Sequence, residues 1–97
     1  MEARFIHVGF GISGPLPEEA LKKVFNSALD WMKYDDHAWI LYTNTDIDTW
    51  RDRIRATPGI KEADSFFLCV FHVTPKSYSG YMQQFAWDWL IKDRSTK

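Results

Sequence analysis

A short apolar run late in the chain limits the fold more than any other stretch. Residues 64–73 are rich in aromatic and β-branched side chains and end just before Thr74 and Pro75. The run is too short for a buried helix and its residue types suit a pleated surface, so it predicts a β-strand. Alternate side chains of a strand point to opposite faces of a sheet, and both faces of this strand are apolar. We therefore expect both faces of its sheet to be covered.

Length and composition indicate one small domain. The chain has 97 residues, so we expect a single domain over residues 1–97. Aromatic residues make up 16% of the chain and include five Trp, enough to fill a small core and supply an interface. The net charge of −1 gives no bulk attraction for nucleic acid or for an anionic membrane.

Cysteine content and hydropathy exclude several classes of protein. Cys69 is the only cysteine, which excludes an internal disulfide and a cysteine-rich zinc site. Its apolar neighbours favour a small buried side chain over a reactive thiol. No apolar run approaches membrane-spanning length, and the first residues lack the apolar core of a signal peptide. We expect a soluble, cytoplasmic protein with no membrane partner.

The N-terminal third predicts a strand, a loop and a helix. The strand covers residues 4–11 and carries one apolar row, Ile6, Val8 and Phe10. Residues 13–17 form a loop, because their Gly and two Pro cannot sustain regular hydrogen bonding. A helix begins at Glu18, where acidic side chains suit the positive end of the helix dipole.

This first helix has two alternative ends. Met32 continues its apolar stripe, which extends the helix to about residue 33. Alternatively the helix ends earlier, residues 30–34 form a strand, and an Asp-rich turn at 35–36 leads into the next strand. Residues 37–43 are a strand under either interpretation.

Two more helices complete the chain. One is capped at its start by Thr45 or Asp46 and is stopped by Pro58 and Gly59. The last helix carries its apolar side on residues spaced by three and four: Tyr78, Tyr81, Met82, Phe85, Ala86, Trp89 and Leu90.

This order of elements predicts an α+β fold, a ferredoxin-like split β-α-β sandwich with an added C-terminal helix. Two helices then cover one sheet face, and the other face is left to the last helix or to a partner chain. We expect this poorly covered face to carry Phe66, Leu68 and Val70, and therefore expect a homodimer. Trp87 lies off the main helical stripe, so we interpret it as an interface anchor, with packing on its own sheet as the alternative.

Two patterns suggest ligand chemistry but are better explained structurally. Residues 9–14 match the spacing G-x-G-x-x-G, yet two prolines separate them from the helix, so an irregular strand end is preferred over a phosphate site. His7, His37 and His72 lie on or beside predicted strands without the local spacing of a metal motif. Asp35 and its neighbour are interpreted as turn residues rather than a general base. We assign no catalytic residue, metal or cofactor.

A basic strip is the candidate nucleic-acid contact. Arg51, Arg53 and Arg55 recur along one predicted helix, near aromatic side chains that suit base stacking. Aspartates interleave with these arginines, so a solvated helix face held by ion pairs is the preferred interpretation.

Several of these segments together resemble a known family. They are the opening strand, Trp31, residues 36–43, a helix begun by Asp46, and the strand over 64–71, with a last helix carrying Trp87, Trp89, Leu90 and Lys92. The chain resembles the SinR-type small proteins, ferredoxin-like relatives of the small CRISPR adaptation nucleases. The resemblance implies a dimer of ferredoxin-like units connected with nucleic-acid metabolism, toxin–antitoxin systems or defence.

The resemblance does not imply catalysis for this chain. The nuclease members hold a divalent metal with an Asp at the end of the first strand, whereas residues 9–12 here contain no carboxylate. We therefore expect a non-catalytic dimer that works through protein contacts in a defence or toxin–antitoxin setting. The alternatives are a metal-dependent nuclease or nucleic-acid-binding protein, and a domain that binds a small ligand between sheet and helices.

Overall fold

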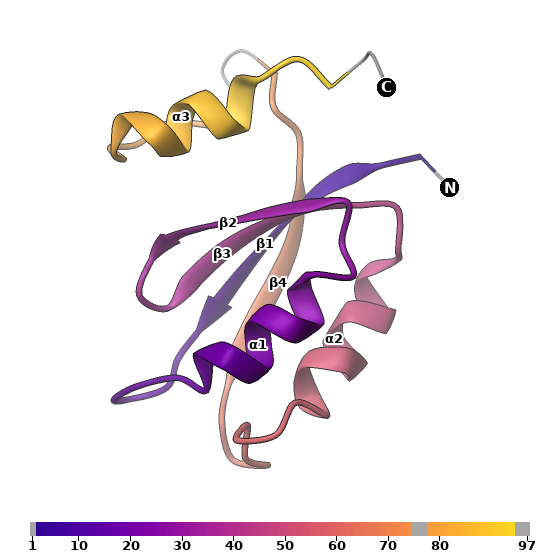
Figure 1. Cartoon of the computed structure of the whole chain (residues 1–97), viewed down its shortest axis with the longest axis vertical. Helices are drawn as coiled ribbons and strands as arrows, with labels where there is room; N and C mark the ends of the chain where they lie inside the picture. The colour runs from indigo at the N-terminus through magenta and orange to yellow at the C-terminus, as the bar shows by residue number, and fades with distance from the viewer. Residues whose placement is uncertain (1, 75–77, 95–97) are drawn as a thin grey trace.

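The computed structural model describes residues 2–74 and 78–94. In chain order its elements are β1 (Arg4–Phe10), α1 (Glu18–Phe25), β2 (Asp30–Asp35), β3 (Ala38–Thr43), α2 (Ile47–Arg55), β4 (Phe66–Phe71) and α3 (Gln84–Ile91). The predicted α+β class is confirmed. Helices α1 and α2 lie side by side next to the sheet, and α3 lies apart from them (Figure 1).

The four strands form one antiparallel sheet in the order β2-β3-β1-β4. Strand β1 is paired on both sides, with β3 and with β4, so it is the strand through which the two halves of the sheet connect. Strands β2 and β4 are the two edges. Each β-α-β unit is split by a strand of the other unit, since β3 lies between β1 and β2 and β1 lies between β3 and β4.

The earlier end of the first helix is the correct one. Helix α1 ends at Phe25 and residues 30–35 form strand β2, so the extension of the helix to about residue 33 was wrong. The position of Met32 in the sequence fits the helical spacing of the apolar residues of α1. Its side chain is nevertheless buried on the sheet face opposite α1. Pairing of β2 with β3 across the short turn outweighs the local helical periodicity.

Helices α1 and α2 cover one face of the sheet and enclose the larger core. The predicted row of β1 is confirmed, because Ile6, Val8 and Phe10 are all buried there. The other fully enclosed members come from β3 and from the two helices: Trp39, Leu41, Leu21, Phe25, Trp50 and Ile54. Helix α2 is capped by Asp46, whose carboxylate accepts a bond from the amide of Thr49 at 3.1 Å.

Strand β4 is oriented opposite to the expectation: the row expected on the poorly covered face points into the core. Phe66, Leu68 and Val70 pack against the core under α1 and α2, so the prediction that they lie on the poorly covered face was wrong. Residues paired across antiparallel strands share a face. Leu68 is paired with Val8 and Val70 with Ile6, which places this row with the buried row of β1.

The second face is covered in part by α3. Met32 and Ile40 of the sheet are buried together with Ala86 and Leu90 of the helix. A helix is about 10 Å wide and strands lie about 4.8 Å apart, so one helix covers about two strands. Helix α3 lies on the β2 side, so β4 is left open on this face around Phe67 and Cys69, whereas Phe71 at the end of β4 packs against the α3 cluster.

The last helix is shorter than predicted. It begins at Gln84, and Tyr78, Tyr81 and Met82 lie in the irregular segment before it. Gly80 in this segment has a φ of +153°, a conformation that interrupts a helix and that other residues rarely adopt. Within the described ranges no helix is both long enough and apolar enough to cross a membrane.

One buried polar contact connects the sheet to α2. The hydroxyl of Thr43 accepts bonds from the indole N–H of Trp50 at 3.1 Å and from the amide of Thr45 at 3.0 Å. We predict that Thr43→Val lowers the free energy of unfolding by about 1–3 kcal/mol, because it leaves the buried Trp50 N–H without an acceptor. Denaturant unfolding measures this change. Thr45→Val, which keeps both bonds, is the control, and equal effects of the two variants would contradict the assignment.

Candidate functional site

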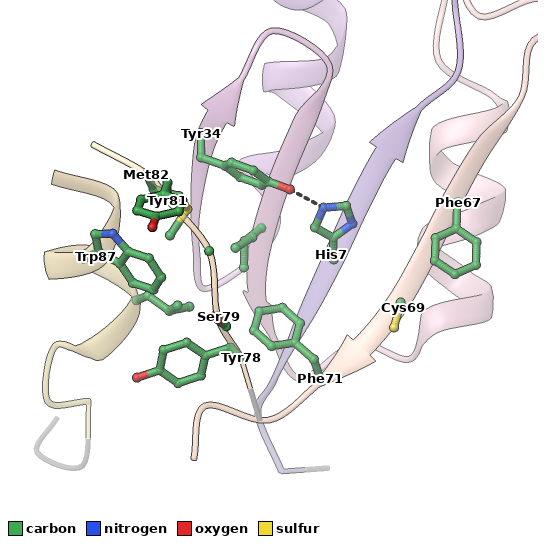
Figure 2. Close-up of a pocket in the computed structure, with 13 residues that line it drawn as sticks. His7, Tyr34, Phe67, Cys69, Phe71, Tyr78, Ser79, Tyr81, Met82 and Trp87 are labelled. Carbon is green, nitrogen blue, oxygen red and sulfur yellow. Dashed lines mark hydrogen bonds between the residues drawn. The ribbon is translucent and has the colours of Figure 1, made fainter. Parts of the chain in front are cut away.

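A hollow lies between the open part of the second sheet face and the segment that leads into α3. It has a volume of about 410 Å³. Figure 2 shows its walls, which are β1 and β4 on one side and Tyr78, Met82 and Trp87 on the other. Its mouth is next to β4, where Phe67 is 67% exposed. The hollow is thus the part of the sheet face that α3 does not fill.

A polar pair lies at the floor of the hollow. The ring Nε2 of His7 and the hydroxyl of Tyr34 are 2.5 Å apart (Figure 2). His7 stands between Ile40 on β3 and Cys69 on β4, which are its paired residues on the two sides. Gly9 gives the imidazole room, because a Cβ at that position would lie 3.2 Å from its Cε1.

Both members of this pair are uncharged at neutral pH. Burial lowers the pKa of His7 below the ordinary value for histidine. Burial raises the pKa of Tyr34, and the negative charge of Asp35 raises it further. The floor therefore carries hydrogen-bonding groups without a net charge.

Asp30 holds α3 against the sheet. Its carboxylate accepts bonds from the indole of Trp89 at 3.0 Å and from the amide of Trp31 at 2.9 Å, and it pairs with Lys92 at 3.2 Å. Burial by itself raises the pKa of Asp30, but the bonds from Lys92, Trp89 and the Trp31 amide outweigh it and hold the pKa below its ordinary value.

Arg94 strengthens the same attachment. Its side chain is only 11% exposed, and its guanidinium lies over the rings of Phe5, Tyr42 and Trp89 at 5.1, 4.9 and 4.5 Å. It also donates to the carbonyl oxygen of Trp89 at 2.7 Å. Cation–π contacts with desolvated rings are among the stronger of their kind, so Arg94 clamps the end of α3 onto β1 and β3.

The arginines of the candidate nucleic-acid strip contact other side chains of the same chain. Arg51 pairs with Asp48 at 3.2 Å and with Asp52 at 3.0 Å. The guanidinium of Arg53 lies over the ring of Trp50 at 5.0 Å. These contacts agree with the preferred interpretation of a helix face held by ion pairs.

Arg55 has a structural position as well. It donates to the carbonyl oxygens of Lys61 at 2.8 Å and Asp64 at 3.1 Å, and lies over the ring of Phe66 at 4.9 Å. It therefore fastens the loop after α2 to the start of β4.

The three histidines are not brought together. His37 donates from Nε2 to the carbonyl oxygen of Gly14 at 2.9 Å. His72 lies just past β4, three residues beyond the Cys69 that faces His7, or on the order of 10 Å along the strand. Among residues 2–74 and 78–94, no three His, Cys, Asp or Glu side chains gather into a group able to hold a metal ion.

The glycine pattern ends a strand. Gly11 donates its amide to the carbonyl oxygen of Ser65 at 2.9 Å, and a Cβ on Gly11 would lie 2.7 Å from the Ser65 hydroxyl. The first turn of α1 carries Glu18 and Glu19, whose negative charges oppose binding of an anion there. Asp35 accepts a bond from the amide of Asp36 at 2.6 Å, which is the geometry of a turn residue.

Trp87 and Cys69 lie in surroundings that differ from those preferred from the sequence. Trp87 packs with α3 on its own sheet and its ring lies 5.9 Å from that of Tyr78, which is the alternative given for it above. Cys69, expected to be buried, is exposed at the mouth of the hollow. Tyr34, Asp30 and Arg94 were missed, because their importance comes from contacts with residues distant in sequence.

Comparisons with known proteins add no relative. No family model, no curated protein and no solved structure matches this chain. The resemblance to the SinR-type proteins therefore stays a prediction.

Acid should release α3 through Asp30. A carboxylate whose pKa is depressed in the folded state stabilises the fold above its ordinary pKa, about 4, and loses this effect as pH falls through the lower folded value. We predict that the indole N–H resonance of Trp89 moves to its undocked position over that range. Asp30→Asn should weaken docking at neutral pH and remove most of the acid dependence. Asp88→Asn on the same helix is the control, and an unchanged acid dependence in Asp30→Asn would refute the role.

Proposed function

We propose that this chain is a ferredoxin-like homodimer that acts through protein contacts rather than through catalysis. Support for the fold comes from the element order β-α-β-β-α-β with an added helix, and from the two β-α-β units that split one another. Support for the dimer comes from the edge strand β4.

Strand β4 lacks the proline and charged side chains that often protect a sheet edge. It is the outermost strand on its side, and its six residues include no proline and no charged side chain. An edge strand exposes unpaired backbone donors and acceptors, and proteins usually blunt such edges with Lys, Pro or a covering element. Phe67 and Cys69 also expose their side chains on this strand. This unprotected edge is the observation that carries the proposal.

A second copy of the chain is the occupant that fits this edge best. Two β4 strands can pair antiparallel about a two-fold axis, so that the same residues meet on both sides. Each strand is uncharged along its length, so pairing brings no like charges together. The pairing would join the two sheets and place the exposed Phe67 side chains on the same face.

The interface differs in detail from the one expected from sequence. The strand is the same, but the contacting row is that of Phe67 and Cys69, because Phe66, Leu68 and Val70 are already engaged with the core. The defence or toxin–antitoxin setting is part of the proposal through the resemblance alone, and the identity of the neighbouring genes tests it.

The metal-dependent nuclease is the competing function. Incubation with RNA and with duplex DNA in the presence of Mg²⁺ or Mn²⁺ distinguishes a nuclease, which cleaves them, from a non-catalytic protein, which does not. Cleavage that is lost on replacing Asp35 or Asp36 would overturn the non-catalytic assignment.

The dimer is tested by molar mass. We expect light scattering to give about twice the 11.4 kDa of one chain, and Phe67→Glu to give the monomer mass, because it sets like charges against each other at the two-fold axis. Phe85→Glu is the matched control, since Phe85 is also exposed, at 53%, but lies on α3. A wild-type monomer at high concentration, or a dimer that survives Phe67→Glu, would refute the interface.

A further inference from the structure

The hollow beside α3 has the features of a small-ligand site. Its volume of about 410 Å³ lies within the range of small-molecule pockets, which are mostly apolar with a few placed polar groups. Its walls are rich in aromatic rings, and its one polar pair, His7 and Tyr34, lies at the floor. A pocket between sheet and helix is the feature that separates a ligand-binding domain from a purely structural one.

The lining excludes charged ligands. None of the described residues that line the hollow is Asp, Glu, Lys or Arg. An ionised group placed there would lose part of its hydration without gaining a partner of opposite charge, which is unfavourable. We therefore expect an uncharged ligand.

The polar pair accepts either kind of hydrogen-bonding group. If the Tyr34 hydroxyl donates to Nε2 of His7, then Nδ1 carries a hydrogen and the phenol oxygen keeps a free lone pair. If Nε2 donates instead, the phenol hydrogen is free and Nδ1 is an acceptor. In either tautomer the Tyr34 oxygen keeps one free hydrogen-bonding position, a lone pair or a hydrogen, so the pair suits a group such as a phenol hydroxyl, which can donate or accept.

We propose that the hollow binds an uncharged aromatic molecule of phenol type, with its hydroxyl at His7 and Tyr34 and its ring among Phe71, Tyr78 and Trp87. These three aromatic side chains line the same hollow as the polar pair (Figure 2). The flat rings offer stacking and edge contacts to an aromatic ligand. The polar pair lies on β1 and β2, away from the proposed dimer strand, although Phe67 and Cys69 of β4 belong both to the mouth of the hollow and to the dimer row.

Three matched probes test the site. They are 2-naphthol, naphthalene and 2-naphthoate, which share a ring system and differ in one group. We expect saturable binding of 2-naphthol about five- to tenfold tighter than of naphthalene, from one added hydrogen bond, and no binding of 2-naphthoate. Equilibrium dialysis measures the three affinities.

Variants separate the polar pair from the apolar walls. The double variant His7→Leu and Tyr34→Phe removes both partners together and leaves no unpaired group, so the fold should persist and circular dichroism checks it. It should bind 2-naphthol and naphthalene equally. Phe85→Ser, outside the hollow, should keep the wild-type preference.

Two results would overturn the site. They are equal binding of 2-naphthol and naphthalene by the wild type, and binding of 2-naphthoate as tight as that of 2-naphthol. The double variant should leave molar mass unchanged, so failure of this site and failure of the dimer are distinguished by different measurements.

Discussion

The pairing of β1 with both β3 and β4 determines where almost every functional side chain lies. One row of β1, with Ile6 and Val8, joins the buried rows of its neighbours beneath α1 and α2. The other row, with Phe5 and His7, faces the opposite side, where coverage is incomplete. The strand therefore separates a side that holds the molecule together from a side that remains available for binding.

Incomplete coverage follows from the size of α3. One helix is too narrow to cover four strands, so it leaves open the β4 side of the face that it packs on. Both the hollow and the exposed residues of β4 result from this incomplete coverage of the sheet face by α3. Asp30 and Arg94 fix which half is covered, because they attach the end of α3 to β1, β2 and β3 rather than to β4.

Charge is used mainly within the chain. The arginines of α2 pair with aspartates, stack on aromatic rings or bind carbonyl oxygens of the following loop. The carboxylates in the first turn of α1 oppose the binding of an anion at that helix end. What is left for recognition is an aromatic hollow with a neutral polar floor, beside an uncharged strand edge.

Local sequence determined most of the element types, the row of Ile6, Val8 and Phe10, and the start of α2 near Thr45 or Asp46, since each depends on residues a few positions apart. It left open whether residues 30–34 continue a helix, and it missed the irregular segment before α3. Alternation showed two apolar rows in β4, but only pairing with β1 decided that Phe66 faces the core and Phe67 the solvent. The contact of His7 with Tyr34 and that of Asp30 with Trp89 join residues 27 and 59 positions apart. No periodicity can report such contacts, because they exist only once the sheet has brought distant segments together.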